Sequence, residues 1–137
     1  MNTKFHLAFK VKDIQSTIDF YHNILGCTKG RETENWIDFD FFGHQISAHV
    51  SKKTQALDYC GKVENIKVPI PHMGCILERK DFLKIKNNLL KHNIEFIVKP
   101  YIRYEGEIGE QQTMFVLDFS NNPIEFKSFT KKGEAFK

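Results

Sequence analysis

The hydrophobic and polar positions of the chain describe the same order of elements twice. Alternation of apolar and polar residues predicts strands, and apolar residues at helical spacing predict one helix in each half. The first copy reads strand, helix and three strands, at residues 5–11, 13–26, 27–32, 35–43 and 45–50. The second copy follows the same order, at residues 72–78, 81–93, 95–100, 113–119 and 124–129.

This repeat predicts an α+β fold built from two tandem βαβββ modules. One module alone leaves open sheet edges and a bare concave face, so two modules are expected to form a curved mixed sheet around a metal-binding cavity. We expect one domain over residues 1–137. Its predicted parts are module 1 at about 3–51, a linker at 52–70, module 2 at about 71–130, and a polar tail at 131–137.

Two histidines occupy matching places in the repeat, and they suggest a metal site. His6 in "FHLAF" opens the first strand, and His72 in "PHMGC" opens its counterpart. Glu125 lies near the start of the last strand, where glutamate is disfavoured and costly to bury. Two imidazoles and one carboxylate with open positions form a facial triad for a divalent metal. The alternative is that each is an ordinary strand residue satisfied by hydrogen bonds.

Composition narrows the class of protein. The 137 residues carry a net charge of +3, with acidic and basic residues interleaved, which argues against a nucleic-acid partner. Three cysteines without a paired spacing indicate free thiols in a reducing compartment. Without a signal-like or membrane-spanning run, we expect a soluble cytoplasmic protein.

Three segments carry a resemblance to a known family: "FHLAFKVKDIQSTIDFYHNILG", "PHMGCILE" and "DFSNNPIEFKSF". Together they resemble the vicinal oxygen chelate superfamily, which includes glyoxalase I, extradiol dioxygenases, fosfomycin-resistance proteins and bleomycin-binding proteins. "FGHQISAH" and "KPYIRYEGEIGEQQTMF" further resemble its dioxygenase-like branch. The resemblance covers nearly the whole chain, and it places His6, His72 and Glu125 on the family's metal positions.

The resemblance implies a metal-dependent enzyme, dioxygenase-like, acting on a small substrate with vicinal oxygens. It implies one divalent metal per site, with Fe(II) favoured and Mn, Ni or Zn possible, and a homodimer. The alternatives are a glyoxalase-like lyase or isomerase, a thiol transferase, or a non-catalytic drug-binding protein of the bleomycin-resistance type. Whether the modules pair within one chain or across a dimer stays open.

The fourth strand separates these reactions. Glyoxalase I enzymes usually carry Glu or Gln where the repeat places Ser47, and serine is a poor ligand for a divalent metal. His49 lies two residues further on the same face of the strand. It is a candidate metal ligand, a candidate for orienting a ligand through a hydrogen bond, or a candidate catalytic base.

The segment "YIRYEGEIGEQQ" is predicted to be a loop near the site. Arg103 in this loop is a candidate catalytic or substrate-binding residue, because its guanidinium group can hold an anion through two hydrogen bonds. Tyr101 and Gln112 are further candidates for substrate contacts. The alternative for Arg103 is a solvated loop charge.

Overall fold

The computed structural model describes all residues from 1 to 137 and divides them into two compact units. Unit 1 comprises Met1–Ala56 and Asp118–Asn122, and unit 2 comprises Leu57–Leu117 and Pro123–Lys137. Each unit contains a four-stranded mixed sheet with helix packed against it. The predicted α+β fold with two βαβββ modules is therefore confirmed.

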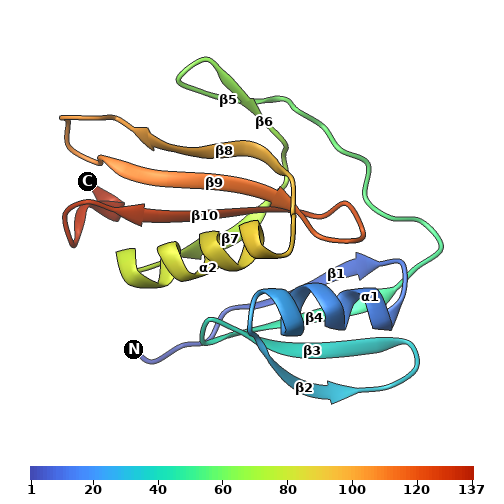
Figure 1. Ribbon diagram of the computed structural model, residues 1–137. Helices are drawn as coiled ribbons and strands as arrows, with labels where there is room; N and C mark the ends of the chain where they lie inside the picture. Colours follow the sequence, from blue (N-terminus) through green and yellow to red (C-terminus); the bar gives the residue numbers. More distant parts are fainter. The chain divides into compact units, whose positions relative to one another are not determined.

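Unit 1 has the sheet order β1-β4-β3-β2, with β1 parallel to β4 and the other neighbours antiparallel (Figure 1). Its elements are β1 (His6–Val11), α1 (Ile14–Ile18), the π-helical η1 (Asp19–Ile24), β2 (Thr28–Glu32), β3 (Trp36–Phe41) and β4 (His44–Val50). Asp13 caps α1, since its carboxylate accepts a hydrogen bond from the backbone N–H of Ser16 at 2.7 Å. The sheet face turned away from η1 carries polar side chains of β3 and β4, such as Asp38 and Ser47, which lie opposite each other in the two strands.

The segment Asp118–Asn122 joins unit 1 through buried polar contacts. The hydroxyl of Tyr21 donates to Oδ2 of Asp118 at 2.7 Å, and both residues are buried. The side-chain amide of Asn122 donates to the backbone carbonyl of Lys10 at 2.8 Å. These bonds explain why a turn late in the sequence belongs to the first unit.

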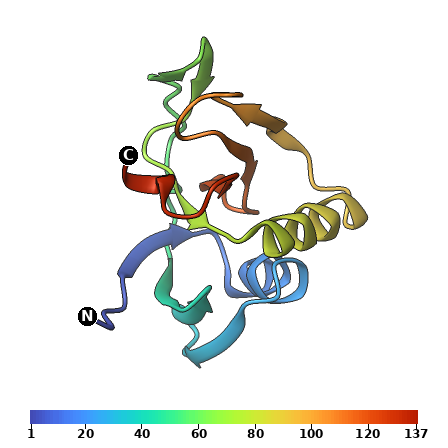
Figure 2. The same ribbon diagram turned by 90° about the vertical axis from the view of Figure 1, so that its left-hand side faces the viewer.

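Unit 2 has the sheet order β7-β10-β9-β8, again with one parallel pair, β7 and β10. Its elements are β5 (Gly61–Val63), β6 (Ile66–Val68), β7 (Met73–Ile76), α2 (Arg79–Lys91), β8 (Phe96–Arg103), β9 (Gln111–Leu117), β10 (Pro123–Phe129) and the short η2 (Glu134–Phe136). Figure 2 shows α2 and the β5–β6 hairpin on opposite sides of this curved sheet. Helix α2 thus packs on one face of the sheet, and the hairpin lies on the side of the other face.

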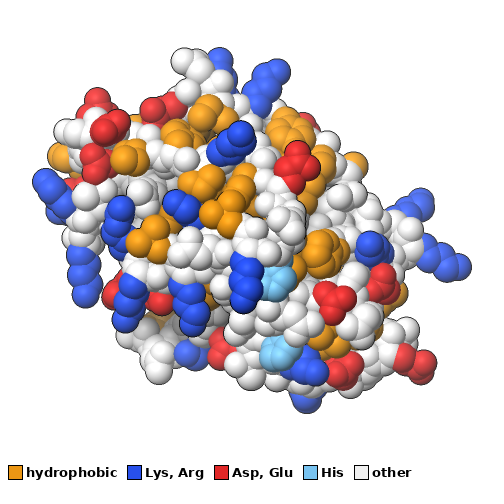
Figure 3. Space-filling view, in the orientation of Figure 1, with side chains coloured by type: hydrophobic (Ala, Val, Ile, Leu, Met, Phe, Trp, Pro, Cys, Tyr) orange, Lys and Arg blue, Asp and Glu red, His pale blue; other side chains and the backbone are white.

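Helix α2 is amphipathic in the way its sequence predicts. Phe82, Ile85 and Leu89 are buried at helical spacing. In Figure 3, Lys and Arg side chains gather over the outer face of this helix, which carries the exposed residues Arg79, Lys80, Lys84 and Lys91. The helices of this chain are all too short or too polar to cross a lipid bilayer.

The pairing register supports the internal repeat. Ala8 pairs with Ser47 in unit 1, and Gly74 pairs with Glu125 in unit 2. Ala8 and Gly74 are as far apart in the sequence as His6 and His72, so they are equivalent positions of the repeat. Ser47 and Glu125 therefore occupy equivalent positions, as the sequence comparison of the two halves predicted.

Three local predictions were wrong. The predicted linker at 52–70 contains the β5–β6 hairpin, which neither length nor composition revealed. Helix α2 begins at Arg79 and not at residue 81, and Glu78 occupies the capping position without a side-chain hydrogen bond. Strand β8 continues to Arg103, so the predicted loop at 101–112 is shorter at both ends.

Candidate functional site

A buried carboxylate with several polar neighbours marks the candidate site in unit 2. Glu125 is 4% exposed on the central strand β10. Its Oε1 lies 3.3 Å from Nε2 of His72 and 3.8 Å from Nζ of Lys127. Its Oε2 accepts a hydrogen bond from the hydroxyl of Thr113 at 2.6 Å and lies 3.4 Å from Nη2 of Arg103. Every neighbour is a donor or a cation, so the carboxylate is held in its charged form.

Alternation along the strands collects these side chains on one face of the sheet. Opposite residues of β9 and β10 pair Thr113 with Lys127 and Phe115 with Glu125, so all four side chains share that face. On the other neighbour, Gly74 of β7 pairs with Glu125. A Cβ atom at this glycine would lie 1.6 Å from the backbone oxygen of Glu125. Glycine is therefore required for β7 to approach β10 this closely.

Hydrogen bonds and burial act in opposite directions on the pKa of Glu125. Burial is the largest influence and raises it, but the hydrogen bonds from His72 and Thr113, with the charges of Lys127 and Arg103, hold the pKa below its ordinary value. The hydrogen bond to Glu125 raises the pKa of His72, against the opposing effect of burial. The two shifts agree in favouring an ion pair between imidazolium and carboxylate.

The ring of His72 is held in one orientation. Its Nδ1 lies 2.7 Å from the backbone oxygen of Pro69, and a carbonyl only accepts, so the ring donates from Nδ1. Phe115 packs edge-on against the ring, with centroids 4.9 Å apart. The Nε2 atom is left to face Glu125, which is the arrangement that a metal-binding histidine usually has.

In unit 1, His6 is oriented in the same way by a chain of polar side chains. Its Nδ1 lies 2.8 Å from Oε1 of Gln45, whose amide nitrogen lies 3.5 Å from Oδ2 of Asp38. The hydroxyl of Ser47 donates to Oδ1 of Asp38 at 2.5 Å. His6 is exposed, whereas Asp38 and Ser47 are buried. The Nε2 atom of His6 is therefore also directed away from its own hydrogen-bond partner.

A pocket of about 350 Å³ lies beside this chain of side chains in unit 1. Its lining includes the polar side chains of Asp38, Gln45, His44 and Arg31. Nη2 of Arg31 lies 4.0 Å from Oδ2 of Asp38, and the guanidinium side chain is largely exposed. The pocket thus presents a guanidinium group and a carboxylate group to a small polar molecule.

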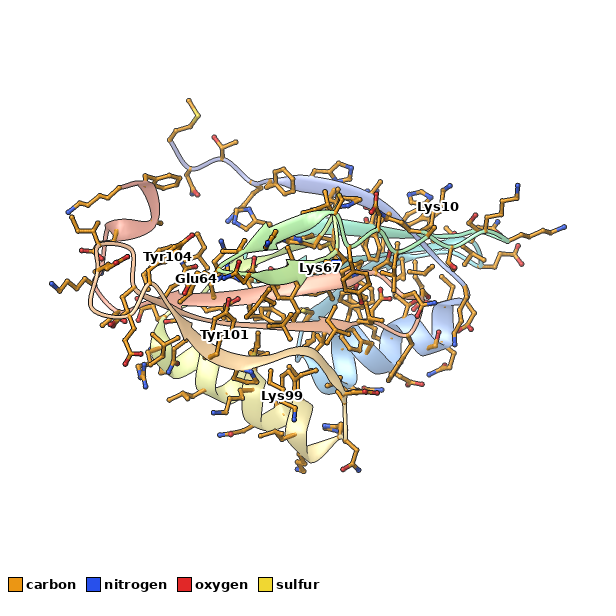
Figure 4. The ribbon with its side chains drawn as sticks, turned by 90° about the horizontal axis from the view of Figure 1, so that it is seen from above. Lys10, Glu64, Lys67, Lys99, Tyr101 and Tyr104 are labelled. Atoms are coloured by element: carbon orange, nitrogen blue, oxygen red, sulfur yellow. The ribbon has the colours of Figure 1, made fainter.

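The β5–β6 hairpin covers part of the Glu125 face. Val68 is buried against Val98 and Phe115, with Tyr101 packed at the edge of this cluster. At the tip of the hairpin, Oε1 of Glu64 accepts a hydrogen bond from the backbone N–H of Tyr104 at 2.8 Å (Figure 4). The segment predicted as a linker therefore forms a wall beside the polar cluster.

Arg103 and Tyr101 lie in the polar cluster, but not in a loop as predicted. Arg103 is the last residue of β8 and is 4% exposed, so its interpretation as a solvated loop charge was wrong. Its Nε donates to the hydroxyl of Tyr101 at 3.0 Å. An arginine between two tyrosines and near glycines is typical of a loop, whereas the pairing of Arg103 with Gln111 of β9 extends the strand here.

Two other predicted residues are placed differently from Arg103 and Tyr101. Gln112 pairs with Ser128, so its side chain faces the side of the sheet opposite to Glu125. The neighbouring Gln111 lies on the Glu125 face instead, and counting alternate positions from Glu125 through the β9–β10 pairing identifies it. His49 belongs to unit 1, is exposed, and lies 6.4 Å from the ring of Trp36 between centroids.

The donor set of the predicted metal ligands fits a divalent metal. Both histidines tie Nδ1 to a carbonyl oxygen and leave Nε2 for coordination, and Glu125 supplies a charged carboxylate. Within either unit, no three side chains of His, Cys, Asp or Glu come together as a metal-binding group. His72 and Glu125 are the two predicted ligands that the structure brings together.

Comparison with solved structures finds proteins that are similar over nearly the whole chain. The chain is 31% identical to a glyoxalase/bleomycin resistance protein/dioxygenase from Alicyclobacillus acidocaldarius, with 98% of this chain and 97% of that chain covered and a TM-score of 0.82. It is 18% identical to the fosfomycin resistance protein FosX from Listeria monocytogenes, with 95% of each chain covered and a TM-score of 0.71. The second likeness supports the fold alone. No family model matches the chain, and neither does any curated protein.

Proposed function

Because the chain belongs to the glyoxalase/bleomycin resistance protein/dioxygenase family, part of the vicinal oxygen chelate superfamily, we propose that it is a metal-dependent enzyme of the dioxygenase-like type. His6, His72 and Glu125 would hold one divalent metal, with Fe(II) favoured over Mn, Ni or Zn. When bound, the metal would supply Lewis-acid polarisation of two neighbouring substrate oxygens. The observation that carries the proposal is the buried contact between Nε2 of His72 and Oε1 of Glu125, 3.3 Å apart.

The residues around Glu125 support this role because they hold both Glu125 and His72 in fixed orientations. Thr113 fixes one carboxylate oxygen, and the backbone oxygen of Pro69 fixes the ring of His72. Two further cations, Arg103 and Lys127, lie within 4 Å of the carboxylate. Hydrogen-bonded partners that hold the ligands in one orientation are typical of a metal site.

In unit 1, Gln45 would orient His6, which would join the other ligands from the same chain or from a second copy. We further propose a homodimer, because each sheet has two edge strands to protect, β1 and β2 in unit 1 and β7 and β8 in unit 2. Sedimentation at micromolar concentration should give twice the monomer mass, and a monomer would refute this part.

A lyase or isomerase is the second candidate, and Asp38 is the observation that favours it. Ser47 itself is not basic near neutral pH, but its hydroxyl donates to the buried carboxylate of Asp38. A carboxylate thus lies beside the position where glyoxalase I enzymes carry theirs. If the reaction needs a second base, Asp38 is a better candidate than the exposed His49.

The experiment is anaerobic reconstitution with Fe(II), Mn(II), Ni(II) and Zn(II), followed by two assays on each sample. The proposal predicts oxygen uptake with one or more members of a catechol panel, and no efficient turnover of the methylglyoxal–glutathione hemithioacetal. Asp38→Asn should lower oxygen uptake only as far as it disturbs Gln45 and the ring of His6, and so by less than the loss of a catalytic base would lower hemithioacetal turnover. Hemithioacetal turnover that Asp38→Asn abolishes, without oxygen uptake on any catechol, would favour the second candidate.

A further inference from the structure

Two buried polar atoms on the Glu125 face make no hydrogen bond within the protein. They are Nη2 of Arg103 and Oε1 of Gln111. Arg103 is 4% exposed and Gln111 is 6% exposed. Buried donors and acceptors are almost always paired, because an unmade hydrogen bond leaves the full desolvation penalty. Two such atoms together need an explanation.

The two side chains are direct neighbours. Arg103 of β8 pairs with Gln111 of β9 in the antiparallel register, so their Cβ atoms are expected about 4.5–5.5 Å apart on one face. Gln111 shares this face with Thr113 and Phe115 by alternation, and Phe115 pairs with Glu125. The free donor and the free acceptor therefore lie side by side, within the polar cluster of unit 2.

Their remaining atoms are held in place, which fixes what each can still bind. Nε of Arg103 donates to the hydroxyl of Tyr101, and Nη2 lies 3.4 Å from Oε2 of Glu125 as an ion pair without a hydrogen bond. Nε2 of Gln111 donates to the backbone oxygen of Gly109 at 3.1 Å. Because that carbonyl only accepts, the amide of Gln111 cannot be reversed, and its oxygen is the free atom.

A group that satisfies both atoms must accept from Arg103 and donate to Gln111. A hydroxyl does both, whereas the oxygens of a carboxylate or a phosphonate only accept and would face the amide oxygen of Gln111 without a proton between them. We propose that Arg103 and Gln111 form a hydroxyl-binding subsite. Resting on the proposed function, this assigns the substrate a further alcohol or phenol hydroxyl beside its two chelating oxygens.

The test compares two probes that keep the chelating pair and differ in the third oxygen. Pyrogallol carries a hydroxyl there, and 3-methoxycatechol carries a methyl ether that accepts but cannot donate. Affinities are measured by anaerobic calorimetry on the Zn(II)-loaded protein, because zinc is redox-inert. We expect pyrogallol to bind about five- to tenfold more tightly, the usual effect of one hydrogen bond.

The matched variants are Gln111→Met and Gln112→Met, which make the same change on opposite faces of β9. The amide oxygen of Gln112 is also buried without a partner, so the two changes are alike except for the face. Gln111→Met should abolish the preference for pyrogallol, and Gln112→Met should retain it. In the unaltered protein, pyrogallol should also shift the side-chain amide resonances of Gln111, a readout that needs no variant and no metal.

Equal affinities for the two probes, binding of neither probe, or an unchanged preference in Gln111→Met would overturn the subsite. A crystal structure with pyrogallol in which an ordered water still bridges Arg103 and Gln111 would also overturn it. Zinc content is measured on the same samples. A metal-replete protein without the preference refutes the subsite alone, whereas a protein that takes up no metal refutes the proposed function, and the amide resonances then decide the subsite.

Discussion

Replacing Thr113 by valine tests how strongly the buried carboxylate depends on its neighbours. The change keeps the shape of the side chain and removes the hydroxyl that donates to Oε2 of Glu125 at 2.6 Å. Thr113 is fully buried and Glu125 is 4% exposed, so water cannot replace the lost donor. A hydrogen bond to a charged group contributes about 1.5–3 kcal/mol. With a urea m-value of about 2 kcal/mol/M, the unfolding midpoint of the metal-free protein should fall by about 1 M.

The control is Thr17→Val, which removes a hydroxyl with a different acceptor. Thr17 is 2% exposed and donates at 2.6 Å to the backbone oxygen of Asp13, a neutral group. The expected loss is smaller, about 0.5–1.5 kcal/mol. Urea unfolding followed by circular dichroism measures both variants. Equal losses, or a loss below about 0.5 kcal/mol for Thr113→Val, would refute the view that Thr113 stabilises a charged Glu125.

Three further outcomes are expected. Burial, the largest influence, raises the pKa of Tyr21 well above 10, so the neutral side chain stabilises the fold below pH 10 and this contribution is lost as pH rises further. The difference in unfolding free energy between the native chain and Tyr21→Phe, measured in urea, should therefore shrink between pH 8 and 10.5. A constant difference would contradict this. Cys60 is exposed, whereas burial raises the pKa of Cys75 to about 12. A disulfide reagent at pH 8 should therefore modify one thiol quickly, Cys60→Ser should remove that fast phase, and a fast phase that survives in Cys60→Ser would contradict this. Gly74→Ala would place a Cβ atom 1.6 Å from the backbone oxygen of Glu125. The variant should therefore fail to fold, or its free energy of unfolding should be lower than that of the native chain by more than about 3 kcal/mol. Near-native stability would contradict this and would show that β7 can shift.

The repeat could be predicted from the sequence because its signal is local and occurs twice. Alternating strands, one capped helix and a histidine at matching positions suffice to align the halves, and the register that pairs Ser47 and Glu125 with equivalent partners supports that alignment. The extent of β8 could not be predicted in this way. Arg103 lies in a strand because it pairs with Gln111 of β9, and its side chain meets a carboxylate that is 22 positions away in the sequence.

The neighbours of the candidate ligands are the part of the site that sequence reasoning missed. The hydrogen bond between Asp38 and Ser47 depends on the register of β3 and β4, which the pattern along one strand does not give. Gln111 was passed over for Gln112 because the start of β9 was placed two residues too late. Periodicity gives the alternation along a strand, whereas the face that each residue occupies depends on which strand pairs with it.

Metal content tests the central claim most directly. Untagged protein reconstituted anaerobically with Fe(II), Mn(II), Ni(II) or Zn(II) and then desalted should retain one metal per chain by elemental analysis. His72→Ala and Glu125→Ala should each lose it, with affinity at least about 10–100-fold weaker, while His49→Ala should keep it. Stoichiometric metal retained in both His72→Ala and Glu125→Ala, or no metal retained by the unaltered protein with any of the four ions, would contradict the account.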